Sequence, residues 1–165
     1  MAKKKKAKLG TLGLVLILVG LAGAVFAVVG LFVSWFAGSV TVLGKTVTEY
    51  YGLFYDFKIA SDSVFPLAVV QAFGVIAVVA AVVSVALMLL KTFGIMNVSG
   101  FAKLLVAAVT IVMGVLALVF TFSFVGSLGG VDAGDLGSAG FAPAYGAFFT
   151  GIGSIVGGAA FLLKK

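Results

Sequence analysis

The chain has 165 residues, of which 63% are hydrophobic and only 10% charged, and its mean hydropathy is +1.34. Globular domains in water carry roughly 45–50% apolar and about 25% charged residues, so this composition excludes an ordinary water-soluble domain. Cys, His and Arg do not occur in the sequence, and all eleven cations are Lys. Disulfides, thiolate chemistry, imidazole metal sites and bidentate arginine clamps are therefore excluded.

Four long stretches carry no charged residue, and they cover residues 9–44, 63–90, 104–131 and 136–163. Each exceeds the roughly 20 residues that a helix needs to cross about 30 Å of hydrocarbon. The sequence therefore predicts an all-α membrane protein with one domain, a four-transmembrane-helix bundle over residues 1–165. The predicted helices cover about 9–36, 63–90, 104–124 and 143–163, and the outer loops about 37–62 and 125–142.

The charges predict the orientation of this bundle. Four crossings place both termini on one side, which receives nine Lys residues and no acid, whereas the other side receives Lys45, Lys58 and all five acids. The positive-inside rule then predicts that both termini and the 91–103 connection lie in the cytoplasm. We expect a multi-pass protein of the plasma (cell) membrane. The basic N-terminal segment is expected to contact anionic lipid headgroups, and no nucleic acid is expected as a partner.

The first predicted helix follows a basic segment, so a signal peptide is the alternative interpretation. Its apolar run continues to Phe36, about twice the usual 7–15 residues of a signal peptide, which favours a retained helix. Small residues three and four apart along it predict close helix packing, and Trp35 and Phe36 are expected at its outer end.

The first outer loop changes to a two-residue period. Residues 39–43 and 46–50 are β-rich and flank Gly44-Lys45, which predicts a hairpin with a type II′ turn. Residues 53–59 also alternate and predict a third strand, so the loop is expected to form a small extracellular antiparallel β-sheet. An aromatic cluster is expected either to be the buried face of this sheet or to be a partner-binding surface; it comprises Tyr50, Tyr51, Phe54, Tyr55 and Phe57.

The second predicted helix begins after Ser61 or Asp62 as N-cap, with Pro66 in its first turn. Gln71 is its one strongly polar side chain. An interhelical hydrogen bond is the favoured role for this amide, and a substrate site is the alternative.

The second outer loop is glycine-rich over residues 126–140 and is predicted to be of low stiffness. Asp132 and Asp135 are interpreted as solvated loop charges, with half of a calcium site as the weaker alternative. The fourth helix carries small residues at helical spacing and is expected to touch another helix tightly, in its own bundle or in a neighbouring protomer. These residues are Gly146, Thr150, Ser154 and Gly158, with Gly153 and Gly157 beside them.

The predicted spans contain no Asp, Glu, Lys, Arg or His, so a proton relay or voltage sensor is not expected. The loops offer no nucleophile paired with a base and no glycine-rich phosphate loop. We therefore expect no enzyme activity, no cofactor and no metal.

The layout resembles the claudin-like tetraspan superfamily, which includes claudins, peripheral-myelin-type proteins and calcium-channel gamma subunits. The family's first loop carries a Trp, then Gly-Leu-Trp, then two Cys; here Trp35 is followed by Gly52-Leu53-Phe54. Residues 55–71 are also similar to the family's passage from the sheet into helix two, and the entry into helix four is similar to a lesser degree. Both cysteines and the Arg often found at the start of helix two are missing.

The resemblance implies a non-catalytic membrane protein that acts in adhesion and assembly or as an accessory subunit of a larger complex. Its partners would be itself or other membrane proteins, bound through the outer sheet and the small-residue helix faces. Because the family's disulfide is absent, Trp35 and Leu53-Phe54 are expected to wedge the sheet onto the bundle. The full set of candidate partner or structural residues is Trp35, Gly52, Leu53, Phe54, Tyr55, Gly146, Gly153 and Gly157.

The alternative function is an oligomeric channel or small-solute facilitator. Its pore would be lined by the polar side chains of the predicted spans, which are Gln71, Ser84, Thr110, Thr121, Thr150 and Ser154.

Overall fold

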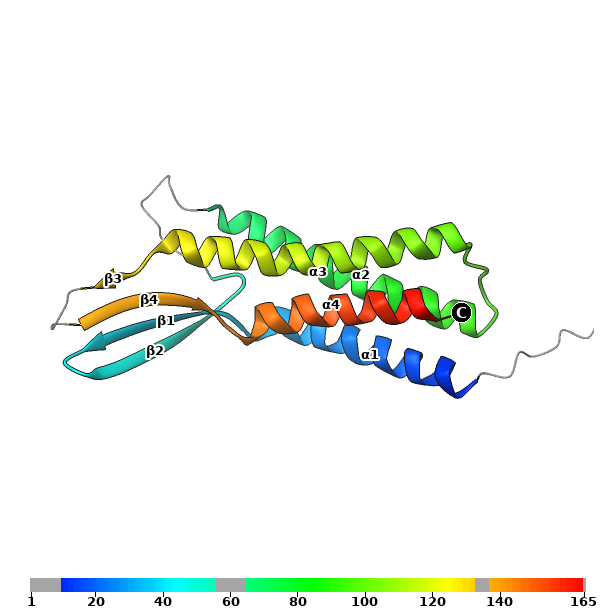
Figure 1. The fold of residues 1–165 in the computed structure, drawn as a ribbon, viewed down its shortest axis with the longest axis horizontal. Coiled ribbons are helices and arrows are strands. Elements are labelled where there is room, and N and C mark those ends of the chain that lie inside the picture. The colour runs from blue at the N-terminus through cyan, green and yellow to red at the C-terminus, as the bar shows by residue number, and fades with distance from the viewer. Residues whose placement is uncertain (1–9, 56–64, 133–136, 165) are drawn as a thin grey trace, which may run out of the picture.

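Four α-helices dominate the structure, a computed structural model that describes residues 10–55, 65–132 and 137–164 (Figure 1). They are α1 (Thr11–Phe32), α2 (Leu67–Thr92), α3 (Gly100–Leu128) and α4 (Tyr145–Leu163). Each is long and apolar enough to cross a membrane; the shortest has 19 residues and, at about 1.5 Å per residue, is about 28 Å long. The prediction of four long apolar helices is confirmed.

The end of the first helix and the start of the second differ from the prediction. α1 ends at Phe32, four residues early, because the chain turns extended at Val33 and takes Trp35 and Phe36 into a strand. α2 begins at Leu67 and its N-cap is Pro66, whose backbone is extended. The predicted caps Ser61 and Asp62 lie outside the described residues.

The connection between α2 and α3 is shorter than predicted. α2 continues to Thr92, and α3 begins at Gly100, four residues before the predicted start. The cause at α3 is Ser99, whose hydroxyl oxygen accepts a hydrogen bond from the backbone N–H of Ala102 at 3.2 Å. This contact satisfies one of the free donors of the first turn and allows the helix to start there.

A four-stranded antiparallel sheet stands at one end of the bundle. Its strands are β1 (Ser34–Val42), β2 (Lys45–Gly52), β3 (Val131–Asp132) and β4 (Gly137–Pro143), in the order β2-β1-β4-β3. The predicted β1–β2 hairpin is therefore present. Of the predicted strand over residues 53–59, residues 53 and 54 form a turn instead, and residues 56–59 lie outside the described part.

The place beside β1 is taken by β4, which comes from the second loop that was predicted to be of low stiffness. Gly137, the first residue of β4, allows the close approach. It has φ +141°, and a Cβ at this position would overlap the carbonyl oxygen of Thr41 on β1. The strand can therefore begin here because the missing side chain lets two backbones meet.

The β1–β2 turn is Leu43–Gly44, one residue earlier than predicted, since Val42 pairs with Lys45. The φ angles of Leu43 and Gly44 are +48° and +77°. Positive φ at both central residues is typical of a type I′ turn and not of the predicted type II′ turn. Gly44 adopts this conformation freely, whereas Leu43 is strained.

Figure 1 shows that the strands continue along the long axis of the bundle. The sheet, the start of α2 and the end of α3 lie at one end. The start of α1, the α2–α3 connection and the C-terminus lie at the other. The two ends are referred to below as the sheet end and the lysine end.

Candidate functional site

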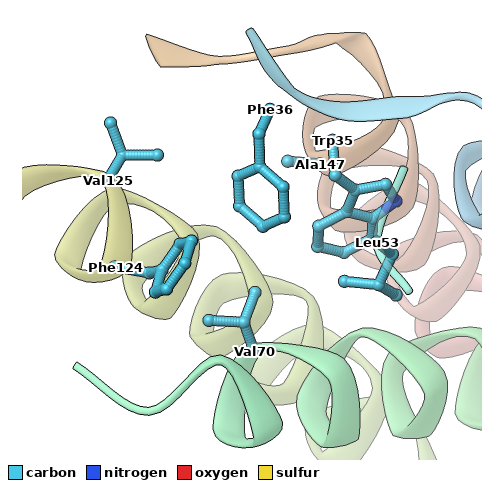
Figure 2. Close-up of a cluster of buried hydrophobic side chains, with 7 residues drawn as sticks. All are labelled: Trp35, Phe36, Leu53, Val70, Phe124, Val125 and Ala147. Carbon is cyan, nitrogen blue, oxygen red and sulfur yellow. The ribbon is translucent and has the colours of Figure 1, made fainter. Parts of the chain in front are cut away.

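The sheet is joined to the bundle through a cluster of buried apolar side chains, which we call the junction core. These side chains come from the sheet segments and from α2, α3 and α4, and Figure 2 shows that Phe36, Trp35, Leu53, Val70 and Phe124 lie around a common centre, with Val125 at the edge. Its members are Trp35, Phe36, Leu53, Val70, Phe124, Val125 and Ala147. Because the cluster joins strands to helices, it determines how the sheet stands on the bundle.

Trp35 lies at the centre of the junction core and is fully buried. Its indole Nε1–H donates a hydrogen bond of 2.6 Å to the carbonyl oxygen of Gly30, which lies in the last turn of α1. Its ring lies between two glycines: a Cβ at Gly146 of α4 would be 2.5 Å from the ring, and a Cβ at Gly74 of α2 2.8 Å from it. The expected wedging role of Trp35 therefore has a physical basis, because glycines on two helices form the socket that receives it.

Leu53 follows β2 and is also fully buried, against Gly74 and Trp35. Its carbonyl oxygen accepts a hydrogen bond of 3.1 Å from Nε2 of Gln71 on α2. Gln71 therefore bonds the end of the hairpin rather than a neighbouring helix, which corrects the interhelical role predicted for it.

Phe54 does not belong to the junction core, and its predicted role in wedging the sheet is wrong. Its side chain is 63% exposed. The cause is the turn after β2, in which the N–H of Tyr55 bonds the carbonyl oxygen of Gly52 at 3.2 Å, so Leu53 points inward and Phe54 outward. Gly52 itself has open space where a Cβ would stand, so no close contact requires a glycine there.

The small-residue face of α4 packs inside the bundle, against α1. A Cβ at Gly153 would lie 2.5 Å from the carbonyl oxygen of Gly23 and 2.6 Å from the nitrogen of Ala27. Gly157 is buried as well, but a Cβ there would meet its nearest neighbour at 3.8 Å, an ordinary contact. Of the two predicted uses of this face, contact within the bundle is the one that the structure contains.

Five of the six polar side chains predicted to line a pore are buried hydroxyls with hydrogen-bond partners. Ser84 of α2 bonds Thr110 of α3 at 2.7 Å, Thr150 bonds the carbonyl of Ala27 at 3.2 Å, and Ser154 bonds the carbonyl of Ala77 at 3.1 Å. Thr121 bonds its own helix. All five side chains are fully buried, and the described residues contain no buried side-chain N or O atom without a partner. Within one chain these five hydroxyls therefore face no open polar path, and the oligomeric channel stays an alternative prediction.

The sheet exposes the predicted aromatic cluster instead of burying it. Tyr50 is 56% exposed and Tyr55 49%, and only Tyr51 is partly buried; Phe57 lies outside the described residues. The ring of Tyr51 packs on that of Tyr55, with 4.6 Å between centroids. Of the two roles predicted for the cluster, that of a buried face is wrong.

One face of the sheet is hollowed over Gly38. The rings of Tyr51 and Phe141 form the walls of a groove of about 240 Å³, and a Cβ at Gly38 would lie 3.1–3.2 Å from both. The Tyr51 hydroxyl donates a 2.7 Å hydrogen bond to a carboxylate oxygen of Glu49. This bond, followed by desolvation and by the Glu49 charge, raises the pKa of Tyr51 above its usual value of 10.0.

Lysine side chains cap helix C-termini at the lysine end. The Lys164 ammonium donates to the carbonyl oxygen of Met88 at 3.4 Å and to the hydroxyl of Thr92, both in the last turns of α2. Lys103 donates to the carbonyl oxygen of Lys164 at 2.6 Å. Cations at helix C-termini complement the helix dipole. Burial, and then the nearby Lys91 cation, lower the pKa of Lys164.

The chain matches no protein-family model and no curated protein. The claudin-like character drawn from Trp35 and Gly52-Leu53-Phe54 accordingly stays a prediction.

Proposed function

We propose that the chain is a non-catalytic, multi-pass protein of the plasma membrane whose sheet stands outside the cell and binds other proteins. Support for insertion comes from the surfaces of the helices, which carry large apolar side chains such as Leu12 (71% exposed) and Phe26 (52% exposed). In water such surfaces promote association, whereas lipid tails cover them without cost.

The orientation is supported by the position of the charges on the folded chain. Lys91, Lys103 and Lys164 gather at the lysine end, where the described residues include no acid. Glu49 and Asp132 are in strands at the sheet end. By the positive-inside rule the lysine end faces the cytoplasm and the sheet faces outward.

The observation that carries the binding role is the exposure of the sheet. Val47 and Tyr50 of β2 are 64% and 56% exposed, and Val40 of β1 is 50% exposed. β-branched and aromatic side chains on a sheet that leaves the bundle provide a protein-binding surface with no lipid to cover it. The resemblance to claudin-like proteins points the same way, toward adhesion and assembly or an accessory role in a larger membrane complex.

A photo-crosslinking amino acid placed at Tyr50 tests this function in the native membrane. We expect illumination to join the group at position 50 to another protein chain. The same group at Phe93, which is exposed in the α2–α3 connection, should not give this adduct. Absence of any protein adduct from Tyr50, with the chain resisting alkaline extraction from membranes, would contradict the binding role. Release by alkaline extraction would contradict membrane insertion itself.

A further inference from the structure

Among the residues that the structure describes, β2 forms an open edge of the sheet. It has eight residues and is outermost in the order β2-β1-β4-β3, whereas the opposite edge strand, β3, has two. Every side chain of β2 except that of Tyr51 is exposed. Proteins protect edge strands by making them short, by placing Pro or charged side chains, especially Lys, in them, or by covering them. β2 is long and contains no Pro, and its two charged residues, Lys45 and Glu49, have opposite signs, so a strand that offers the opposite charges at the matching positions can pair with it.

The turn determines which backbone groups face this edge. In a hairpin closed by a two-residue turn, the flanking residues, here Val42 and Lys45, exchange both backbone hydrogen bonds. Alternation then directs the N–H and C=O groups of Thr46, Thr48 and Tyr50 to the open side. Consistent with this pattern, the Thr41 carbonyl points away from β2, toward Gly137 of β4.

The side chains of β2 are complementary to a second copy of β2. When two copies run antiparallel with Thr46 opposite Thr48, the outward backbone groups pair and Val47 meets its own counterpart. Lys45 of each copy then lies opposite Glu49 of the other, which gives two oppositely charged pairs. A shift of the register by two residues in either direction places Lys45 opposite Val47 or Tyr51 and loses both pairs. Within one strand, Lys45 and Glu49 are about 13 Å apart and do not pair.

We propose that the β2 edge binds the β2 edge of a second copy of this chain, antiparallel and centred on Val47. The inference rests on the function proposed above and names the partner.

The direction of the strands places this second copy in a facing membrane. The strands follow the long axis of the bundle (Figure 1), and antiparallel copies are related by a two-fold axis perpendicular to the strands. The two bundles therefore point in opposite directions. The paired region covers residues 45–49, and the turn of one copy reaches only Tyr50 and Tyr51 of the other, so neither turn meets a bundle.

Disulfide trapping at Val47 tests the pairing, because the chain has no Cys of its own. Val47 of the two copies would form a non-hydrogen-bonded pair with Cα atoms about 4.5 Å apart, within the range of a disulfide. V40C is the matched control. Val40 lies on β1, pairs with Val47 of β2 and is also half exposed, but it would be about 14 Å from its own counterpart in the second copy. Full-length protein with two different tags is reconstituted into separate liposomes, which are mixed and oxidised.

We expect disulfides between the two tags for V47C at about tenfold the level of V40C. Equal yields at the two positions would overturn the proposal. Disulfides that form only between copies within one liposome would overturn the assignment to facing membranes.

Charge exchange provides a second test that does not depend on oxidation. K45E and E49K each place like charges opposite each other twice, so liposomes carrying either variant alone should cluster about tenfold less than wild type. A mixture of the two should cluster again, because each position then faces its opposite charge. Failure of the mixture to recover would contradict the register.

Labelling of a cysteine at position 47 separates a failure of the self-pairing from a failure of the proposed function. Val47→Cys is labelled from outside the liposomes by an impermeant maleimide before oxidation. Labelling without disulfide formation or clustering overturns the self-pairing alone, and the Tyr50 crosslink then identifies whether a different protein occupies the sheet. Absence of labelling contradicts the outer position of the sheet and overturns both.

Discussion

Replacement of Gly153 by Ala tests the contact between α1 and α4 on which the bundle depends. A Cβ at Gly153 would be 2.5 Å from the Gly23 carbonyl oxygen and 2.6 Å from the Ala27 nitrogen, while ordinary contacts begin near 3.4 Å. Both neighbours are backbone atoms, so no side-chain rotation relieves the overlap, and the helices must separate by about 1 Å. Such overpacking costs about 1–3 kcal/mol and weakens the 3.2 Å bond from Thr150 to Ala27.

Gly157 provides a matched control four residues further along the same helix. A Cβ there would be 3.8 Å from its nearest neighbour, so G157A has room and gains up to about 1 kcal/mol of helix propensity. We therefore expect G153A to be less stable than G157A by about 2 kcal/mol.

Unfolding in mixed micelles with increasing sodium dodecyl sulfate measures this difference. Trp35 is the only tryptophan and lies in the junction core, so its fluorescence reports the sheet end, while circular dichroism reports the helices. If G153A unfolds at the same or a higher detergent fraction than G157A, the close approach of α1 and α4 is refuted.

Three further changes probe the sheet and its junction. L53A should destabilise the protein by about 2–4 kcal/mol because Leu53 is fully buried, whereas F54A, at the exposed neighbour, should change the free energy of unfolding by less than about 0.5 kcal/mol. Equal effects of the two substitutions on thermal unfolding would contradict the burial of Leu53. L43N should stabilise the hairpin by up to about 1 kcal/mol, because Asn tolerates the positive φ of this turn, and hydrogen exchange in β1 and β2 should become slower. Unchanged or faster exchange would contradict the strain assigned to Leu43. E49Q should lower the raised pKa of Tyr51 toward 10.0 in an ultraviolet titration, and an unchanged titration would contradict the role given to the Tyr51–Glu49 bond. Because the folded state holds the phenol proton more tightly, wild type should also lose stability relative to Y51F as the pH rises through that raised pKa.

The elements that could be predicted from the sequence are those with a long or regular pattern. Uncharged runs of more than 20 residues indicate membrane-length helices whatever they pack against, and the alternation around Lys45 indicates a hairpin. The burial of Trp35 and Leu53 followed from their place at the join of sheet and helix. The predicted wedging role of Phe54 is wrong because the β-alternation stops at Gly52, and the turn that follows directs Leu53 inward and Phe54 outward.

The parts that could not be predicted depend on partners distant in sequence. β4 has almost no side-chain pattern, and its pairing with β1 depends on the space left by residues such as Gly137. Because the helices are apolar on all sides, composition does not reveal which side faces the bundle interior, and the alternative hypothesis of a channel places the hydroxyls of Ser84, Thr110 and Ser154 in a pore lining. Only the packed structure shows that each hydroxyl has a partner.

Labelling of single cysteines in intact cells measures most directly whether the sheet lies outside a membrane that the four helices cross. Thr48 on β2 and Asn97 in the α2–α3 connection are both exposed and lie at opposite ends of the molecule. An impermeant maleimide should react with T48C in intact cells and with N97C only after the membrane is permeabilised. Reaction of N97C in intact cells, or protection of T48C, would contradict this arrangement.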